Sequence, residues 1–194
     1  MTEPLNIQIL VGSVREGRIS LPVARWVQER SVGRSDLSAQ LVDLADWNLP
    51  MFALPTSPAM GDYTDPLQQR WAATIGKADG YILVSPEYNH STSPVLKNAL
   101  DYLWAEWNRK PVAFVSFGNV GGARAIEQLR GIAIELRMAP LGEAVHLFDV
   151  RAKVEKQRFD DGDEKHLTQL FDSLVWWGTT LRAGRLEPHN VGQA

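Results

Sequence analysis

The chain has 194 residues, of which 44% are hydrophobic and 22% are charged, an ordinary composition for a globular protein. Its formal net charge of −3 argues against general nucleic-acid binding, which needs a basic face, and against a carrier that docks through a strongly acidic surface. There are no cysteines, which excludes disulfides, thiolate metal sites and thiol nucleophiles.

The amino-terminal stretch MTEPLNIQ contains neither a basic segment nor a signal-type apolar run. No apolar run approaches the roughly 20 residues that a membrane-spanning helix needs. We therefore expect a cytoplasmic protein that binds neither membranes nor nucleic acid. The length predicts one domain over residues 1–194.

Five short apolar runs predict strands near residues 5–12, 38–44, 80–85, 111–118 and 142–148. The third and fourth runs are almost wholly apolar, as expected for strands that are buried on both faces. Helical stretches lie between them, and three are expected to begin at a capping residue with proline in the first turn. The pairs are Ser20 with Pro22, Asp65 with Pro66, and Ser93 with Pro94.

The last helix is expected to begin in the segment DDGDE and to end near Arg182 and Arg185, which suits the helix dipole. Its predicted apolar face consists of Leu167, Leu170, Phe171, Leu174, Trp177 and Leu181. Between the second strand and the next helix lies a proline-rich irregular stretch, residues 45–64. A stretch of that length is usually a functional or a mobile loop.

Alternating strands and helices predict an α/β fold, a three-layer sandwich around a five-stranded parallel sheet of order 2-1-3-4-5. In such a sheet, ligands bind at the carboxyl ends of the strands, where the winding direction reverses. The loops after strands 1, 3 and 4 should therefore converge there. These loops have the sequences GSVREGRIS, SPEYNHSTSP and SFGNVGG.

The first loop has the composition of an anion site. Gly12 permits a sharp turn, Ser13 and Ser20 supply hydroxyl groups, and Arg15 and Arg18 can add charge-assisted hydrogen bonds. The following helix start offers unpaired N–H groups and a positive dipole end. This combination suits one phosphate, although the two arginines taken alone are equally well explained as solvated loop residues.

Two nucleotide-binding motifs can be tested against the same loop. The dinucleotide fingerprint GxGxxG fails because Val14 replaces its second glycine. The P-loop spacing is met by Gly12 and Gly17, but Arg18 replaces the lysine and Ile19 replaces the magnesium-binding hydroxyl. Nucleoside triphosphate chemistry is therefore disfavoured.

The second and third loops suit a flat ring system. Pro86 stiffens the second loop, Tyr88 offers an aromatic face, and Asn89 offers amide donors and acceptors. The third loop, residues 116–122, supplies small residues where a ring can approach the backbone. Together, the three loops predict a pocket for a flat phosphorylated cofactor.

The segments GSVREGRIS, PEYNHSTSPVLKNALDYL and SFGNVGGARA resemble the NADPH-dependent FMN reductase family, in the same order and over nearly the whole chain. The resemblance implies a flavodoxin-like fold, FMN as the cofactor, and NADPH or NADH as the cosubstrate. The family includes quinone, chromate and azo-dye reductases.

The resemblance also implies roles for individual residues. Ser13, Arg15 and Ser20 would hold the FMN phosphate, with Leu21 and Pro22 beside it. The isoalloxazine ring would be lined by Pro86, Glu87, Tyr88 and Asn89. Ser116 and Gly118 would lie under the other side of the flavin. The third loop departs from the family pattern. Phe117, Asn119 and Val120 stand where many relatives carry glycines.

In an enzyme of this kind, the flavin carries the redox chemistry. A hydride from NAD(P)H would reach flavin N5, and a small acceptor such as a quinone, free flavin, azo dye or chromate would then take the electrons in a ping-pong cycle. No side chain needs to act as acid or base, and His90 is expected to be a spectator. The alternative function is a flavin-binding electron-transfer or regulatory module without its own NAD(P)H turnover.

The other histidines, His146, His166 and His189, have no ligand spacing, so no metal site is expected. The segment 94–107 carries a broad apolar arc made of Val95, Leu96, Ala99, Leu100, Leu103, Trp104 and Trp107. Such an arc predicts self-association through this helix, as a homodimer or homotetramer. The alternative is packing against a neighbouring helix of the same chain.

Overall fold

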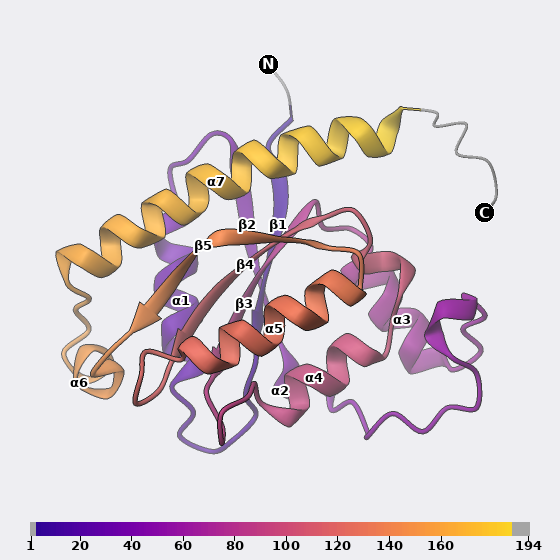
Figure 1. The fold of residues 1–194 in the computed structure, drawn as a ribbon, viewed down its shortest axis with the longest axis horizontal. Coiled ribbons are helices and arrows are strands. Elements are labelled where there is room, and N and C mark those ends of the chain that lie inside the picture. Colours follow the sequence, from indigo (N-terminus) through magenta and orange to yellow (C-terminus); the bar gives the residue numbers. More distant parts are fainter. Residues whose placement is uncertain (1–2, 188–194) are drawn as a thin grey trace.

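A computed structural model describes residues 3–187 of the chain. Within this range, five parallel strands form one sheet of order β2-β1-β3-β4-β5, as predicted (Figure 1). The strands are β1 (Leu5–Val11), β2 (Leu37–Asp43), β3 (Gly80–Pro86), β4 (Pro111–Phe117) and β5 (Ala139–Leu147). Every residue of β3 and β4 is buried, because both strands lie inside the sheet and are covered on both faces.

The helices form the two outer layers of the sandwich. They are α1 (Ser20–Ser31), α2 (Leu44–Trp47), α3 (Pro66–Ile75), α4 (Pro94–Asp101), α5 (Ala123–Glu135), α6 (Val150–Glu155) and α7 (Asp161–Leu186). Helices α1 and α7 pack on one face of the sheet, whereas α3, α4 and α5 pack on the other. In Figure 1, α7 and α5 lie on opposite sides of β5. This is the predicted three-layer α/β sandwich.

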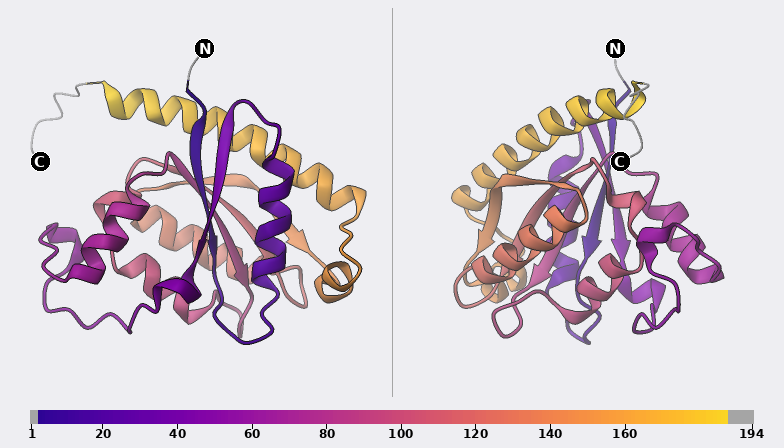
Figure 2. Two further views of the ribbon diagram at one scale, coloured as in Figure 1. Left: turned by 180° about the vertical axis from the view of Figure 1, so that it is seen from behind. Right: turned by 45° about the vertical axis from the view of Figure 1, so that its right-hand side comes forward.

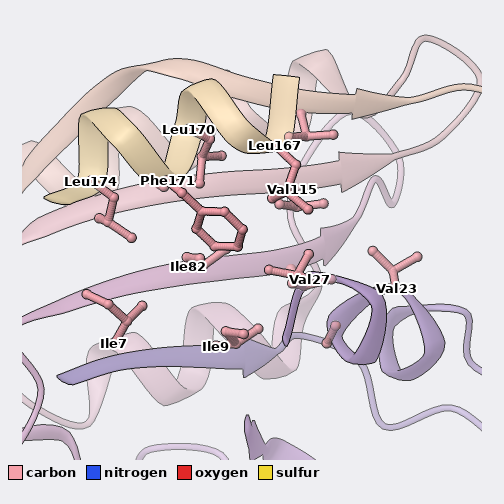
Figure 3. Close-up of a cluster of buried hydrophobic side chains, with 14 of the residues drawn as sticks. Ile7, Ile9, Val23, Val27, Ile82, Val115, Leu167, Leu170, Phe171 and Leu174 are labelled. Carbon is pink, nitrogen blue, oxygen red and sulfur yellow. The ribbon is translucent and has the colours of Figure 1, made fainter. Parts of the chain in front are cut away.

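The core under α1 and α7 consists mainly of aliphatic side chains, and Figure 3 shows those around the ring of Phe171. Ile7 and Ile9 of β1 meet Val23 and Val27 of α1, and Phe171 of α7 lies over the middle of the sheet. All of these side chains are essentially inaccessible to water. Each contributes about 1.5–3 kcal/mol by leaving water, so this layer holds α1 in a fixed position at the end of β1.

The core on the opposite face is built around aromatic rings. Trp107 packs edge-on against both Trp71 and Tyr81, with ring centroids 6.5 and 4.9 Å apart. The indole N–H of Trp71 donates to the carbonyl of Ala99 at 3.0 Å, and that of Trp107 donates to the carbonyl of Leu100 at 3.1 Å. Both buried indoles are therefore satisfied by α4.

Two of the three predicted helix caps are confirmed. The side chain of Asp65 accepts from the N–H of Gln68, and that of Ser93 accepts from the N–H of Leu96. The prediction for Ser20 is wrong. Ile19 holds the N-cap position of α1 and Ser20 is the first helical residue, so the Ser20 hydroxyl does not cap the helix.

The expected helix over residues 94–107 is shorter than predicted. Helix α4 ends at Asp101, and the chain then turns into a single 3-10 turn, Ala105–Trp107. Most of the apolar arc is buried within the chain's own core, namely Leu96, Ala99, Leu100, Leu103 and Trp107. Val95 and Trp104 stay half-buried. Packing within one chain thus accounts for most of the arc.

The proline-rich stretch after β2 is more ordered than the expected irregular loop. It contains α2 and a 3-10 turn, Pro58–Met60. Asn98 of α4 holds its middle, because its side chain accepts from the N–H of Phe52 at 2.8 Å and donates to the carbonyl of Pro50 at 2.7 Å. Tyr102 donates a further hydrogen bond to the same carbonyl at 2.9 Å.

Helix α7 begins and ends as predicted, but its apolar face is narrower. Trp177 is 40% exposed and its neighbour Trp176 is 62% exposed, because both lie beside the stripe that contacts the sheet. Gly178 faces the sheet instead, and a Cβ there would lie 2.6 Å from the side chain of Leu5. Neither α7 nor any other helix between residues 3 and 187 is long and apolar enough to cross a membrane.

A buried lysine lies at the amino-terminal edge of the sheet. The Lys110 ammonium donates to the carbonyl of Gly76 at 3.0 Å and to the hydroxyl of Tyr81 at 3.1 Å. Burial, and then the positive charge of Arg185, lower the pKa of Lys110 from 10.5 to about 8. The charged form of this lysine is therefore less stable, relative to the neutral form, in the folded protein than in water.

This pKa predicts a pH dependence of stability. Above about pH 8 the folded protein loses the Lys110 proton while the unfolded chain keeps it, so the free energy of unfolding should rise with pH. We expect a gain of about 1.5 kcal/mol between about pH 8 and pH 9.5, measured by urea denaturation. Lys110→Met should abolish the gain, whereas Lys165→Met, at an exposed position on α7, should retain it. A flat wild-type profile would contradict the prediction.

Candidate functional site

The loops after β1, β3 and β4 converge at the carboxyl ends of the strands, as the topology requires. The hydroxyl groups of Ser13 and Tyr88 share a hydrogen bond of 3.0 Å, which joins the first loop to the second. The N–H of Glu87 donates to the carbonyl of Phe117 at 2.9 Å, which joins the second loop to the third. In Figure 2, the loop after β1 and helix α6 both lie at this end of the sheet.

Gly12 is needed where the chain leaves β1. Its N–H donates to the carbonyl of Val84 at 2.8 Å, and a Cβ at this position would lie only 2.7 Å from the same oxygen. The hydroxyl of Ser93, the cap of α4, donates to the carbonyl of Gly12. The first loop is thus held against β3 and α4 at the place where it begins to curve.

A small polar hollow opens directly beyond this turn. Its volume is about 100 Å³, below the roughly 300–1,000 Å³ typical of sites that enclose a whole small molecule. It is lined by residues 13 and 15–20, Pro86, Tyr88, Phe117 and Arg151. A hollow of this size and composition suits one charged group of a larger ligand.

Ser20 carries the clearest sign that this hollow binds a ligand. Its side chain is fully buried, and its hydroxyl has no hydrogen-bond partner among the described residues. A buried hydroxyl without a partner is costly, so it calls for an explanation such as a bound ligand. The first N–H groups of α1 lie in the same turn and also lack helical partners. A phosphate oxygen at this position would satisfy both.

The two arginines of the first loop differ in their surroundings. Arg18 is largely buried and forms an ion pair with Asp43 at the end of β2. Arg15 is exposed, and its guanidinium lies 5.7 Å from the centre of the Tyr88 ring. Leu21 and Pro22 follow Ser20 in the first turn of α1, are half-buried and line neither this hollow nor the one described next.

A second, larger hollow adjoins the first, and Arg15 and Tyr88 line both. Its volume is about 900 Å³, which is within the range of small-molecule sites. The remaining lining residues are Glu87, Asn89, Ser91, Thr92, Pro94, Lys97, Gln128 and Ile132. Three predicted ring-lining residues, Glu87, Tyr88 and Asn89, are thus brought together, whereas Pro86 faces the smaller hollow.

The carboxylate of Glu87 is held by a residue that the sequence analysis did not single out. Arg124, at the start of α5, forms an ion pair with it and also donates to it from the backbone N–H at 3.2 Å. A second guanidinium nitrogen of Arg124 lies 2.7 Å from Nε2 of His90. His90 lines neither of the two hollows, and its pairing with Arg124 gives it a structural position.

The third loop contributes less than expected. Ser116 is fully buried and its hydroxyl donates to the carbonyl of Ser85 at 2.7 Å, so the structure does not bring it into either hollow. Gly118 packs against Glu87, because a Cβ there would lie 2.9 Å from the Glu87 Cβ. Contacts of Ser116 and Gly118 with a cofactor remain predictions.

Histidine and carboxylate side chains do not gather into a metal site within the described part of the chain. No group of three or more His, Asp or Glu residues between 3 and 187 has the geometry to hold a metal ion. His146 and His166 are included in this range, whereas His189 lies outside the described residues.

Comparison with known proteins identifies the family. Residues 5–170 match the model of the NADPH-dependent FMN reductase family. The chain therefore belongs to this family of oxidoreductases, as its loop sequences predict, with FMN as the cofactor and NAD(P)H as the cosubstrate.

Individual relatives agree with this assignment. The chain is 38% identical to an NAD(P)H-dependent FMN reductase of Schizosaccharomyces pombe over 171 residues, 85% of this chain and 84% of the relative. It is 32% identical to a quinone reductase of Escherichia coli over 189 residues, 94% and 98% of the two chains. Among solved structures, the flavoenzyme FerB of Paracoccus denitrificans superposes with a TM-score of 0.72 at 21% identity, covering 91% of this chain and 98% of that one. That likeness supports the flavodoxin-like fold.

The residues present fit FMN. Its single phosphate matches the small hollow with the unpaired Ser20 hydroxyl, and its planar ring matches the larger hollow beside Tyr88. Because Arg15 lines both hollows without a carboxylate partner in residues 3–187, it is the arginine of the first loop most available to the phosphate.

Arg15→Ala should therefore weaken FMN binding by about 1.5–3 kcal/mol, the range for a hydrogen bond to a charged group. The dissociation constant of the apoprotein can be measured from the quenching of flavin fluorescence. Arg70→Ala, which removes an exposed arginine of α3 outside both hollows, is the matched control. Wild-type affinity in the Arg15 variant would show that Arg15 does not bind the phosphate.

Proposed function

We propose that this chain binds the FMN phosphate in the small hollow and the flavin ring in the large one, and transfers electrons from NAD(P)H to a small acceptor by a ping-pong mechanism. The observation that carries the proposal is the joining of the two hollows through Arg15 and Tyr88. One hollow has the charge and size for a phosphate, and the other has the volume for a ring and a second ligand.

Bound FMN supplies the hydride chemistry, and the protein has to bind, orient and shield it. Tyr88 forms an aromatic wall whose hydroxyl is fixed by Ser13. Arg124 fixes the loop that carries Tyr88 and Asn89 by holding Glu87. These contacts make the larger hollow a rigid surface on which a ring can be oriented, and none of them requires an acid or a base.

A quinone is the acceptor that the relatives favour, since several of them are named quinone reductases. Another relative, from Burkholderia, is named a 2-hydroxy-1,4-benzoquinone reductase. Free flavin, azo dyes and chromate are further candidate acceptors, because a hollow as open as this one sets few limits on shape. Assays with NADPH and NADH against each acceptor class would rank them.

A flavin-binding carrier without turnover is the competing function. The near-neutral net charge of −3 disfavours it, because carriers commonly dock through strong surface charge. Rapid bleaching of the yellow protein by NADPH without oxygen would exclude the carrier, whereas flavin that stays oxidised would favour it.

The ping-pong proposal predicts the form of the steady-state kinetics. Because donor and acceptor share one hollow, they cannot be bound together, and the oxidised nucleotide must leave before the acceptor enters. Double-reciprocal plots against NADPH at several fixed quinone concentrations should give parallel lines. Intersecting lines would mean that both ligands bind at once, and the segment 45–64 would then be the first place to search for a second site.

We further propose that the protein self-associates. Because most of the apolar arc is buried within the chain's own core, this proposal rests on the few arc residues that stay partly exposed. Val95 and Trp104 are the members of the arc that stay half-buried in the single chain. Light scattering at micromolar concentration should show a dimer or tetramer rather than a species near 21.7 kDa. A monomer at that concentration would contradict the proposal.

A further inference from the structure

We propose that Arg151 of α6 recognises a phosphate monoester at the small hollow, so that an element outside the three ligand-binding loops completes the site. The inference rests on the proposed function, because it concerns the same hollow. Neither the family's loop motifs nor the sequence pattern indicates a role for α6.

The position of Arg151 follows from the topology. Helix α6 begins three residues after β5 ends, so it lies at the same end of the sheet as the loops after β1, β3 and β4 (Figures 1 and 2). Val150 and Val154 of α6 pack against the core formed by α1 and α7, which fixes the helix on the sheet. Arg151 lies between these two anchors in the sequence and lines the small hollow, although it is over a hundred residues away from Arg15 along the chain.

Arg151 also lines a separate groove, so it is one of the residues that the two spaces share. The groove has a volume of about 770 Å³ and runs beside the third loop, past Ile19, Phe117, Asn119 and Phe148. Ile19 and Phe117 line the small hollow as well. A phosphate bound at the junction can therefore belong to a molecule that lies on either side of it.

A phosphate in the hollow carries more negative charge than the one unpaired arginine of the first loop, Arg15, can balance. A phosphate monoester carries a charge of about −1.5 to −2 at pH 7. Arg18 is neutralised by Asp43, and Glu16 adds a negative charge to the lining. Arg15 and Arg151 are the arginines of this lining that have no ion pair with another described residue, so two exposed guanidinium groups are available to a phosphate dianion.

The hollow itself provides the second observation that points to a ligand. The Ser20 hydroxyl, 0% exposed and without a partner in residues 3–187, lines the same small space as Arg151. Asp149 and Glu155 flank Arg151 along the groove, but neither forms an ion pair with it in the described chain. The guanidinium of Arg151 is thus available to an incoming anion.

Two phosphate monoesters are relevant to the proposed function, the phosphate of FMN and the 2′-phosphate of NADPH. Each has a natural counterpart without that group, riboflavin in the first case and NADH in the second. A residue that recognises the phosphate changes the ratio within a pair, whereas a residue that merely supports the fold changes both members equally.

The test compares Arg151→Ala with Arg158→Ala, which removes an exposed arginine from the segment after α6 that lines neither space. Dissociation constants for FMN and riboflavin are measured on apoprotein by fluorescence quenching. The kcat/KM values for NADPH and NADH are measured on FMN-saturated protein. We expect Arg151→Ala to lower roughly tenfold either the affinity (1/Kd) for FMN relative to riboflavin or the kcat/KM for NADPH relative to NADH, and Arg158→Ala to lower neither ratio. Arg151→Lys, which keeps the charge but loses the planar fork, should restore part of the loss.

A fall in the affinity for FMN relative to riboflavin supports the inference with the cofactor phosphate as the ligand. A fall in kcat/KM for NADPH relative to NADH supports it with the nucleotide phosphate. If Arg151→Ala unfolds at the wild-type temperature and leaves both ratios unchanged within twofold, the inference is overturned and the proposed function stays intact. Wild-type protein that binds neither FMN nor riboflavin would overturn the proposed function and this inference with it.

Discussion

The site depends on the close contact between the end of β1 and the neighbouring strand β3. Gly12 lies against the carbonyl of Val84 on β3 with no room for a Cβ, and the cap residue of α4, Ser93, donates to the carbonyl of Gly12. This contact sets where the first loop starts to curve and therefore where Ser13 and Ser20 lie. Strands β1 and β3 are neighbours because the winding of the sheet reverses between them. The same strand order therefore sets both the topology and the position of the ligand-binding loop.

Burial on both faces of the sheet makes that constraint rigid. Strands β3 and β4 are inaccessible along their whole length, with aliphatic packing on one face and a group of buried aromatic rings on the other. A protein interior packed at this density does not let neighbouring strands slide, so the carboxyl ends of the strands keep their relative heights. The hollows at this edge are consequently defined by backbone geometry, and loop side chains add the specific chemistry.

The loops themselves are held by polar contacts between elements that are distant in sequence. Arg124 ties Glu87 to α5, Asp43 ties Arg18 to β2, and Asn98 ties the segment after α2 to α4. Each of these pairs takes a charged or polar side chain out of the set available to a ligand. Among the described residues that line the small hollow, Arg15 and Arg151 have no ion pair, and the Ser20 hydroxyl and the Nε of Arg18 have no hydrogen-bond partner.

The sequence by itself predicted the strand order and the end of the sheet where the three loops converge, because apolar periodicity and loop composition are local properties. Loop composition and the family resemblance also pointed to Ser13, Arg15, Arg18, Ser20 and residues 86–89, which line the two hollows. Only the tertiary structure decided which of those side chains are free. Arg18 and Glu87 have the right chemistry for a ligand but are paired with Asp43 and Arg124, and Ser116 is buried beneath its own loop. Arg151 reaches the hollow from a helix with no motif. Such pairings depend on distances between residues far apart in the chain, which no pattern along the sequence contains.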